Sequence, residues 1–311
     1  MSIVTLTMNP AIDISADVAR VLPTHKLRST SVRRDPGGGG INVARVIARL
    51  GGEVRAIYPV GGPIGDLLRR LVDAEKLASE TIPLSQDTRE SFTVEESKTG
   101  KQYRFVLPGP ELTHDECRKC LAAVAQMQPT PSFFVASGSL PAGVPDDFVA
   151  RAAHAAKALG AKVVVDTSGP ALAAALAEGV FLVKPNLREL QELTGSALDG
   201  RQQRLSAARD LIEQGAAEVL ALTLGQDGGL LVTRRQAFYA PALPVEPVSA
   251  VGAGDSFLGA MIWSLAAGQG IENAFRYGMA AGSAALLSAG TELCKADDVL
   301  RLHPQVHLQP L

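Results

Sequence analysis

Short runs of β-branched residues alternate with longer segments rich in alanine and leucine along most of the 311-residue chain. Runs this apolar predict strands that are buried on both faces, as in a mostly parallel sheet. The alternation therefore predicts an α/β fold with helices on both sides of the sheet. The expected strands are 3–8, 54–60, 133–136, 162–166, 181–183 and 219–223, followed by a hairpin of 229–232 and 236–239. The expected helices are 41–50, 67–75, 146–159, 170–177, 188–193, 205–214, 256–267, 271–287 and 296–302.

Two polar, β-prone stretches that are rich in arginine interrupt this alternation. They span residues 12–34 and 81–107, and the second contains two expected strands, 91–96 and 102–106, around the turn Ser97–Gly100. We expect both stretches to form a small β-sheet that covers a cleft as a lid. The chain is then a single domain. Its large α/β core comprises residues 1–11, 35–80 and 108–311, and its lid comprises residues 12–34 and 81–107.

Composition excludes several classes of protein. A content of 46% hydrophobic and 20% charged residues predicts a sizeable core, and a net charge of −2 predicts no binding to nucleic acid or to an anionic membrane. The apolar run 277–290 is shorter than the ~18–20 residues that a membrane span requires. Cys117 and Cys120 have redox or half-zinc spacing, but without a second pair they are expected to be two thiols on a helix. A soluble, cytoplasmic enzyme is expected.

The segment Val251–Ser256, with the sequence Val-Gly-Ala-Gly-Asp-Ser, leads into an apolar helix. The first N–H groups of a helix lack partners within the helix and can bind an anion. Three small residues would let a phosphate approach this backbone, and Asp255 could then take a proton from an attacking hydroxyl. The alternative is that Asp255 merely caps the helix. The segment alone leaves both interpretations open.

A second glycine-rich segment, Pro36–Asn42, opens the first long helix. Four consecutive glycines indicate either a linker or a close approach of a ligand to the backbone, and the apolar helix that follows favours the ligand. The segment lacks the third glycine of a dinucleotide fingerprint, which disfavours a dehydrogenase. The chain also contains no P-loop motif.

Two further segments follow strand ends, where open α/β sheets bind ligands. In Lys184–Glu189, the side chains of Asn186 and Glu189 could face one hydrated Mg²⁺, or they could form a capping box at a helix start. The segment Thr223–Gly228 could contact a ligand or form a simple turn. The lid adds cationic side chains that could hold a phosphate already present on an acceptor. These side chains are Lys26, Arg28, Arg89 and Arg104.

Taken together, these segments resemble the PfkB, or ribokinase-like, family of sugar kinases. The family's glycine motif matches Gly38–Ala44, its C-terminal motif matches Gly252–Asp255, and its magnesium motif matches Asn186-x-x-Glu189. The resemblance spans nearly the whole chain and implies a three-layer α/β/α domain with a small β-sheet lid. The branch that acts on phosphorylated ketohexoses fits best. Its markers are Thr5–Asp13, Tyr103–Phe105, Ser137–Pro141 and Val183–Asn186.

The resemblance implies that ATP phosphorylates the 1-hydroxyl of fructose 6-phosphate. Asp255 would be the base, and the amides of Gly252, Ala253 and Gly254 would stabilise the transferred phosphoryl group. Residues implied to bind the sugar phosphate are Asp13, Gly38, Gly39, Asn42, Arg89, Arg104, Ser139, Lys26 and Arg28. Residues implied to line ATP are Lys184, Asn186, Thr223, Gly225, Gly228 and Ser283, with Lys26 as an alternative nucleotide contact. Glu189 and Asn186 would hold Mg²⁺, Glu189 through water.

Several family members also bind K⁺ through backbone carbonyls. The matching positions are Ser249, Val251, Ala285, Ser288 and Gly290. This chain departs from the family there, because Ser249-Ala-Val-Gly252 lacks the usual Asp-Thr pair and Glu292 replaces a basic or neutral residue. The lid often forms the dimer contact in this family, so a homodimer is expected.

Three alternatives stay open beside the fructose 6-phosphate kinase. Tagatose 6-phosphate and fructose 1-phosphate kinases share the mechanism, but they usually carry a lysine in the glycine motif, where this chain has glycine throughout Gly37–Gly40. A non-catalytic sensor of sugar phosphates or nucleotides on the same fold is the third alternative. The retained aspartate and anion-binding glycines favour an enzyme over a sensor.

Overall fold

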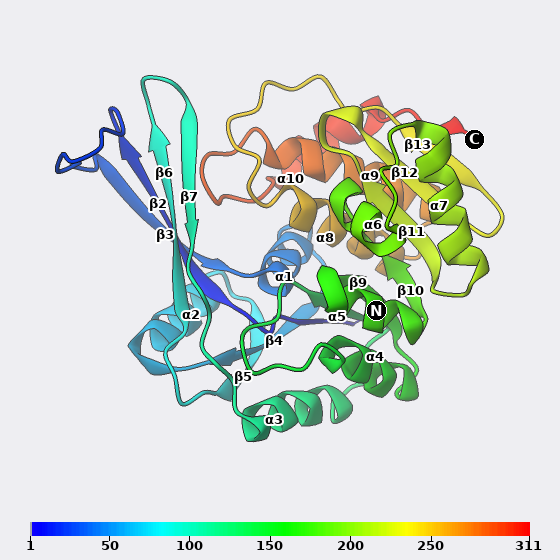
Figure 1. The fold of residues 1–311 in the computed structure, drawn as a ribbon, viewed down its shortest axis with the longest axis horizontal. Helices are drawn as coiled ribbons and strands as arrows, with labels where there is room; N and C mark the ends of the chain where they lie inside the picture. The colour runs from blue at the N-terminus through cyan, green and yellow to red at the C-terminus, as the bar shows by residue number, and fades with distance from the viewer. Residues whose placement is uncertain (1) are drawn as a thin grey trace.

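A computed structural model describes residues 2–311 and places most of its strands in one ten-stranded sheet (Figure 1). Seven neighbouring strands, from β11 to β5 in the order below, pair in parallel, and a hairpin and a short C-terminal strand extend one edge in antiparallel fashion. In spatial order the strands are β14 (Gln309–Pro310), β13 (Ala237–Ala240), β12 (Gly229–Thr233), β11 (Ala217–Thr223), β10 (Val180–Val183), β9 (Lys162–Asp166), β8 (Phe133–Ser137), β1 (Ile3–Leu6), β4 (Val54–Val60) and β5 (Ala78–Pro83). The predicted mostly parallel sheet and its terminal hairpin are confirmed.

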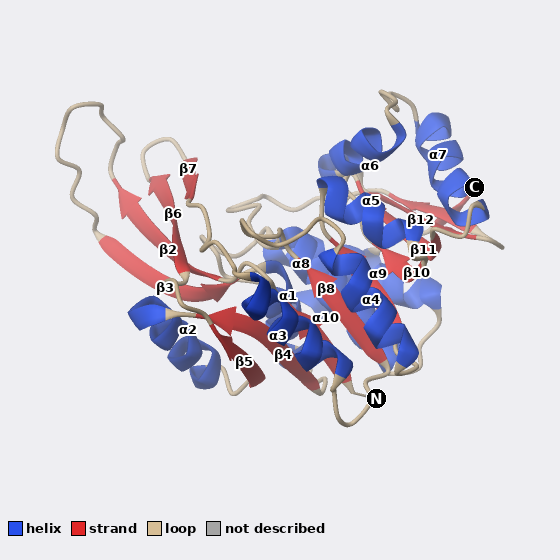
Figure 2. Cartoon of the chain, turned by 60° about the horizontal axis from the view of Figure 1, so that its bottom comes forward, coloured by secondary structure: helices blue, strands red, loops and turns tan. Residues whose placement is uncertain are grey.

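Helices cover both faces of this sheet, so the core has three layers (Figure 2). One face packs against α3 (His114–Ala125), α4 (Phe148–Ala158), α5 (Gly169–Ala177), α6 (Leu187–Thr194) and α7 (Arg201–Glu213). The other packs against α1 (Gly39–Arg49), α8 (Ala253–Ala266), α9 (Ile271–Ala285) and α10 (Ala296–Leu302). Helix α2 (Gly62–Ala74) packs with α1 and β4 in a smaller apolar cluster. Within residues 2–311, no helix combines the length and apolar character of a membrane span.

A second sheet of four strands projects from the core and forms the lid (Figures 1 and 2). Its spatial order is β3 (Ser31–Gly37), β2 (Ala11–Val18), β6 (Arg89–Glu96) and β7 (Lys101–Val106). Its bounds differ from the expected 12–34 and 81–107. Strand β3 pairs with β2 as far as Gly37, and β5 extends the large sheet beside β4, so residues 81–83 lie in the core.

Some elements were not among the expected strands and helices. Strand β5 is half-exposed at the sheet edge and contains Ser79, Glu80 and Thr81, so it lacks the apolar run of the central strands. Helix α3 begins with charged residues after a capping box between Thr113 and Glu116. Its buried face contains the free thiols of Cys117 and Cys120. The two cysteines therefore lie on a helix, as expected, and burial raises the pKa of Cys120 to about 12.

Candidate active site

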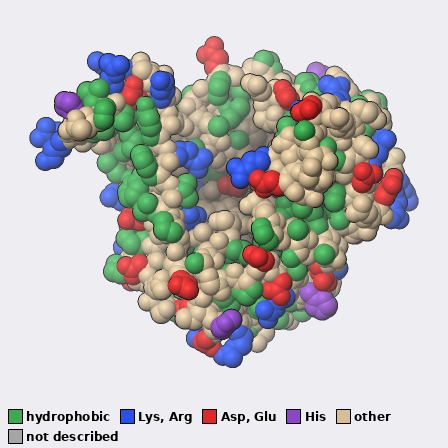
Figure 3. Space-filling view, viewed as in Figure 1, with side chains coloured by type: hydrophobic (Ala, Val, Ile, Leu, Met, Phe, Trp, Pro, Cys, Tyr) green, Lys and Arg blue, Asp and Glu red, His purple; other side chains and the backbone are tan. Residues whose placement is uncertain are grey.

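A cavity of about 320 Å³ opens at the carboxyl ends of the parallel strands. Figure 3 shows the hollow between the lid and the helices opposite it, with basic and acidic side chains at its rim. Its walls come from segments far apart in the sequence that the fold brings together. The lining residues are Gly39, Ser137, Gly138, Ser139, Asp166, Thr167, Ser168, Lys184, Glu189, Gly252, Gly254 and Asp255.

Helix α8 begins at this cavity without a side-chain cap. Its N-cap, Gly252, has a φ of 75°, and a Cβ there would lie 2.6 Å from Cδ2 of Leu293. The left-handed conformation favours glycine at this position, and a methyl group there would displace the end of the Leu293 side chain. No side chain caps the amides of the first turn, which border the cavity, and this favours the binding of an anion.

Asp255 does not cap α8, so the capping interpretation is wrong. Its Oδ2 instead accepts a hydrogen bond of 2.8 Å from Nδ2 of Asn42 on helix α1. Burial, and then the charge of Asp166, raise the pKa of Asp255 to about 6, while Asn42 and Lys184 lower it in part. A carboxylate with this pKa is suited to accept a proton near neutral pH.

The start of α1 shows why the glycine run is not a linker. Gly38, the N-cap, has a φ of 112° and no side-chain cap. A Cβ on Gly39 would overlap the hydroxyl of Ser137, and one on Gly40 would lie 2.5 Å from the carbonyl oxygen of Leu6. The backbone of this segment is thus packed directly onto β1 and β8. A second uncapped helix start, with Gly39 at its first position, reaches the cavity in this way.

Lys184 and Asp166 form a nearly buried ion pair in the wall of the cavity. Their Nζ and Oδ1 atoms are 3.0 Å apart. Burial alone would lower the pKa of Lys184, but Asp166 raises it above its ordinary value, so the ammonium group is retained. Asp166 was not among the predicted site residues, although it lies at the carboxyl end of an expected parallel strand, where ligands bind.

Asn186 and Glu189 form the capping box that was one of the two alternatives. Oδ1 of Asn186 accepts from the amide of Glu189 at 2.9 Å, and Oε2 of Glu189 accepts from the amide of Asn186 at 2.8 Å. Glu189 also lines the cavity, and burial raises the pKa of its carboxyl group. The capping box leaves the Oε1 atom of Glu189 without a bond to this helix, so the carboxylate can also face a hydrated cation.

The other residues expected to contact the nucleotide lie beyond the lining of this cavity. Thr223 forms an isolated bridge with Asn186, and its amide donates to the carbonyl of Pro185 at 3.0 Å. Gly225 and Gly228 have φ values of 58° and 91° in the turn that follows β11. Ser283 is buried on α9.

At the base of the lid, Asp13 on β2 lies within electrostatic reach of Arg89 on β6 and Arg104 on β7. Burial raises the pKa of Asp13, and the two arginines lower it in part. The Nη2 atom of Arg89 donates to the carbonyl of Asn9 at 3.0 Å, and Asn9 donates to the hydroxyl of Ser139 at 3.2 Å. Asn9, which was not proposed as a site residue, thus connects the lid arginine to the cavity.

Two polar atoms in this region are buried without a hydrogen-bond partner among the described residues. They are Nε of Arg89 and Oδ1 of Asn9. Buried polar atoms of this kind usually have a partner, so they mark a place where a polar ligand can bind.

Lys26 and Arg28, which were also expected to bind the sugar phosphate, lie away from the cavity. Both lie on the exposed loop between β2 and β3 at the tip of the lid, and neither lines the cavity (Figure 1).

The residues at the expected K⁺ positions lie close together beside the lid. The hydroxyl of Ser249 donates to the carbonyl of Gly290 at 2.9 Å, and the hydroxyl of Ser288 donates to that of Leu293 at 3.4 Å. The amide of Val251 donates to the hydroxyl of Ser249 at 3.3 Å. The remaining position is Ala285, the last residue of α9. The hydroxyls of Ser249 and Ser288 thus bond to two carbonyls of the loop between α9 and α10.

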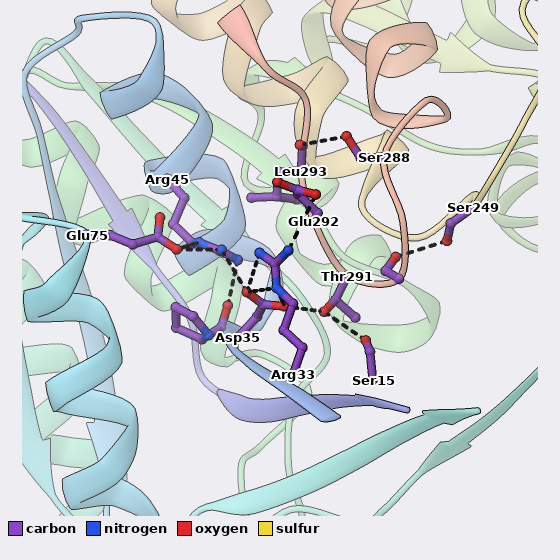
Figure 4. Close-up of polar contacts among 12 residues, drawn as sticks. Ser15, Arg33, Asp35, Arg45, Glu75, Ser249, Ser288, Thr291, Glu292 and Leu293 are labelled. Atoms are coloured by element: carbon purple, nitrogen blue, oxygen red, sulfur yellow. Dashed lines mark hydrogen bonds and ion pairs between the residues drawn. The ribbon is translucent and has the colours of Figure 1, made fainter. Parts of the chain in front are cut away.

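Glu292, which departs from the family pattern, has a partner on the lid. Its carboxylate lies 3.4 Å from Nη1 of Arg33 on β3 (Figure 4). The neighbouring Thr291 donates to Oδ2 of Asp35 at 2.8 Å and bonds to the hydroxyl of Ser15 at 3.3 Å. The departure is therefore accounted for by an ion pair between this loop and the lid.

Comparison with known proteins identifies the class to which this fold and site belong. The profile of the pfkB family of carbohydrate kinases matches residues 3–298. The chain belongs to this family, which confirms the resemblance seen in the sequence. A plant ribokinase from Arabidopsis thaliana shares the fold, with a TM-score of 0.74 at 20% identity.

Other relatives are more similar to this chain than the plant ribokinase is. An ATP-dependent 6-phosphofructokinase isozyme 2 from Mycobacterium tuberculosis is 46% identical over 96% of this chain and 88% of its own length. The isozyme 2 of Escherichia coli is 40% identical over 97% of both chains. A crystal structure of phosphofructokinase-2 from Escherichia coli superposes with a TM-score of 0.94, covering 98% of this chain and 99% of the other.

Proposed function

We propose that this chain is an ATP-dependent kinase that phosphorylates the 1-hydroxyl of fructose 6-phosphate and forms fructose 1,6-bisphosphate. The observation that carries the proposal is the Asp255 carboxylate, whose pKa is about 6, beside the uncapped start of α8 in the cavity. The two relatives named 6-phosphofructokinase isozyme 2 support the choice of acceptor.

In this proposal Asp255 accepts the proton of the sugar hydroxyl as that oxygen attacks the γ-phosphorus of ATP, and the bond from this phosphorus to the β,γ-bridging oxygen breaks and releases ADP. The first amides of α8 stabilise the negative charge on the transferred phosphoryl group, and the ammonium of Lys184 adds a positive charge nearby. Arg89 and Arg104 bind the phosphate that the sugar already carries, because a guanidinium matches phosphate oxygens in a bidentate manner. Asp13, Asn42 and Ser139 bind sugar hydroxyls.

The site fits a divalent cation that is held mainly by the nucleotide. Within residues 2–311, no group of three or more His, Cys, Asp or Glu side chains could bind a metal directly. Glu189 would therefore hold Mg²⁺ through water, and the ion would neutralise phosphate charge. K⁺ would bind through backbone carbonyls at Ser249, before α8, and at Gly290, between α9 and α10, where the Gly290 oxygen accepts from Ser249 and keeps a second lone pair for the ion. A crystal structure of the Escherichia coli relative contains potassium.

A second acceptor is supported by a specific relative. A 1-phosphofructokinase of Bacillus subtilis is 32% identical over 99% of this chain. Four consecutive glycines at Gly37–Gly40, in place of the lysine that is usual in such enzymes, favour fructose 6-phosphate. The position of the acceptor phosphate relative to the reacting hydroxyl decides between the two sugars.

The test is a coupled assay of ADP release with fructose 6-phosphate, fructose 1-phosphate and tagatose 6-phosphate as acceptors. We expect the highest kcat/KM with fructose 6-phosphate. A higher value for either of the other sugars would reassign the acceptor and leave the mechanism intact. Binding of ATP without release of ADP for all three would instead support a non-catalytic sensor.

We further propose a homodimer through the lid, because the lid exposes large apolar side chains. Phe105, Val106 and Val32 are 55%, 63% and 54% exposed, although all three lie on strands. Apolar surface of this kind is typical of an interface. Light scattering should give a dimer mass that Phe105→Asp converts to a monomer mass. Leu300→Asp on α10, where the leucine is 53% exposed, is the matched control and should leave the mass unchanged.

A further inference from the structure

Helix α1 contains a fully buried arginine one turn after Asn42. The side chain of Arg45 is only 1% exposed, and the sequence motifs assigned it no function. Its Nη1 donates to the carbonyl of Pro36 at 2.8 Å, and its Nε donates to Oε1 of Glu75 at 2.8 Å (Figure 4). Its Nη2 lies 3.6 Å from Oδ1 of Asp35. Contacts from the end of α2 and from the lid strand β3 therefore fix the position of the guanidinium group.

The same Nη1 atom of Arg45 faces Oδ1 of Asn42 at 3.3 Å. A guanidinium group has N–H donors and no acceptor, so the amide atom that faces it is the oxygen. The amide nitrogen of Asn42 then points the other way, where it donates to Asp255 at 2.8 Å. If the amide were reversed, its oxygen would face the carboxylate and its NH₂ group would face the donors of Arg45.

We propose that Arg45 is a positioning residue for phosphoryl transfer, which acts by holding Asn42 in the orientation that donates to the Asp255 carboxylate. A hydrogen bond to the charged form of an acid favours that form, so the orientation keeps Asp255 ready to accept a proton. Arg45 itself does not line the cavity. The proposal rests on the proposed function in one respect, since it takes Asp255 as the base.

Other charged groups also act on Asp255. Asp166 and Asp13 raise its pKa, and Lys184 lowers it. Glu189 lines the same cavity from α6. Arg45 pairs with Glu75 and Asp35, and among the groups around Asp255 it acts on Asp13, whose pKa it lowers. Loss of Arg45 would favour the neutral form of Asp13 and so weaken the effect by which Asp13 raises the pKa of Asp255. A rise of the Asp255 midpoint in a variant without Arg45 would therefore come from Asn42.

The first measurement is the titration of the Asp255 carboxyl group by ¹³C NMR in the enzyme without substrate. The spectrum of Asp255→Asn assigns the signal. In Arg45→Met we expect the midpoint to rise by about one pH unit, because the amide of Asn42 can turn and accept from the protonated acid. At pH 6 such a shift lowers kcat about fivefold, and kcat recovers above pH 8. A purely structural defect would lower kcat at every pH.

Glu75→Gln is the matched control. It removes a charge that contacts Arg45 but keeps an acceptor and the donor that faces Asn42, so the midpoint of Asp255 should not move. The double variant Arg45→Met/Glu75→Gln removes opposite buried charges together, which avoids leaving the Glu75 carboxylate unpaired if Arg45→Met folds poorly. It should show the same shift as Arg45→Met.

An unchanged midpoint in a folded variant that lacks Arg45 would overturn the proposal. The NMR titration needs no acceptor, so its outcome is separate from that of the proposed function. A wild-type protein without turnover would reject the kinase. A shifted midpoint in that protein would still establish the effect of Arg45 on Asp255.

Discussion

The helix starts of α8 and α6 both reach the cavity, and they satisfy their first amides in opposite ways. Helix α6 has a closed capping box, in which Asn186 and Glu189 bond to each other's backbone amides. Helix α8 begins at Gly252 without a side-chain cap, and its Asp255 turns away to Asn42. The start of α6 satisfies its own amides, whereas the start of α8 retains donors for an anion. The position of the carboxylate, more than its presence, separates a structural helix start from a candidate catalytic one.

The largest effect is expected at Asp255. Asp255→Asn keeps the size of the side chain but removes the base, so kcat should fall by about a thousandfold. ATP binding should persist, since the amides of α8 are unchanged. Steady-state ADP release and calorimetry with ATP measure the two quantities. Turnover within tenfold of the wild type would show that α8, like α6, uses its carboxylate for structure alone.

A smaller effect is expected from closing the start of α8. Gly252→Ala places a methyl group where φ is 75° and should lower kcat by about a hundredfold, because the amides of the first turn shift. Gly268→Ala at the other end of the same helix is the matched control, with a φ of 80° and no atom within 4 Å of the added Cβ.

Both glycine variants should lose about 1–2 kcal/mol of unfolding free energy, because alanine is strained in the left-handed region. Urea denaturation measures this loss. Equal losses of kcat in both would mean that the open start of α8 contributes only stability.

The smallest effect is expected at the closed start of α6. Asn186→Ala removes the cap and should cost about 1 kcal/mol of unfolding free energy. If Asn186 also contacts the nucleotide, KM for ATP should rise severalfold at constant kcat. Thr113→Ala is the matched control, since it opens the capping box of α3, which is remote from the cavity. A KM for ATP that changes equally in both variants would leave Asn186 with a capping function only.

The parallel core was predictable because its strands are apolar without interruption and its helices are periodic. Strand β9, for example, has the predicted bounds Lys162–Asp166. The lid bounds were less predictable, since β3 continues to Gly37 through pairing with β2, and β5 joins the large sheet through pairing with β4. Strand pairing between distant segments leaves little signal in either segment alone.

The site was predictable where a motif contains the chemistry, and less so where the chemistry depends on pairing. The glycines and Asp255 were identified because small residues precede a carboxylate at a helix start. Asn42 and Asp255 are 213 positions apart, so their hydrogen bond could not be derived from spacing. The Lys184–Asp166 pair and the contact between Arg45 and Asn42 likewise require the folded chain.

The contacts of Thr291 and Glu292 with β2 and β3 have a mechanical consequence (Figure 4). They latch the connection between α9 and α10 to the projecting sheet at three side chains, Ser15, Arg33 and Asp35. A swing of that sheet away from the core must either break the latch or pull the connection with it. Gly290, one residue before the latch, would then move together with its carbonyl, which Ser249 now binds.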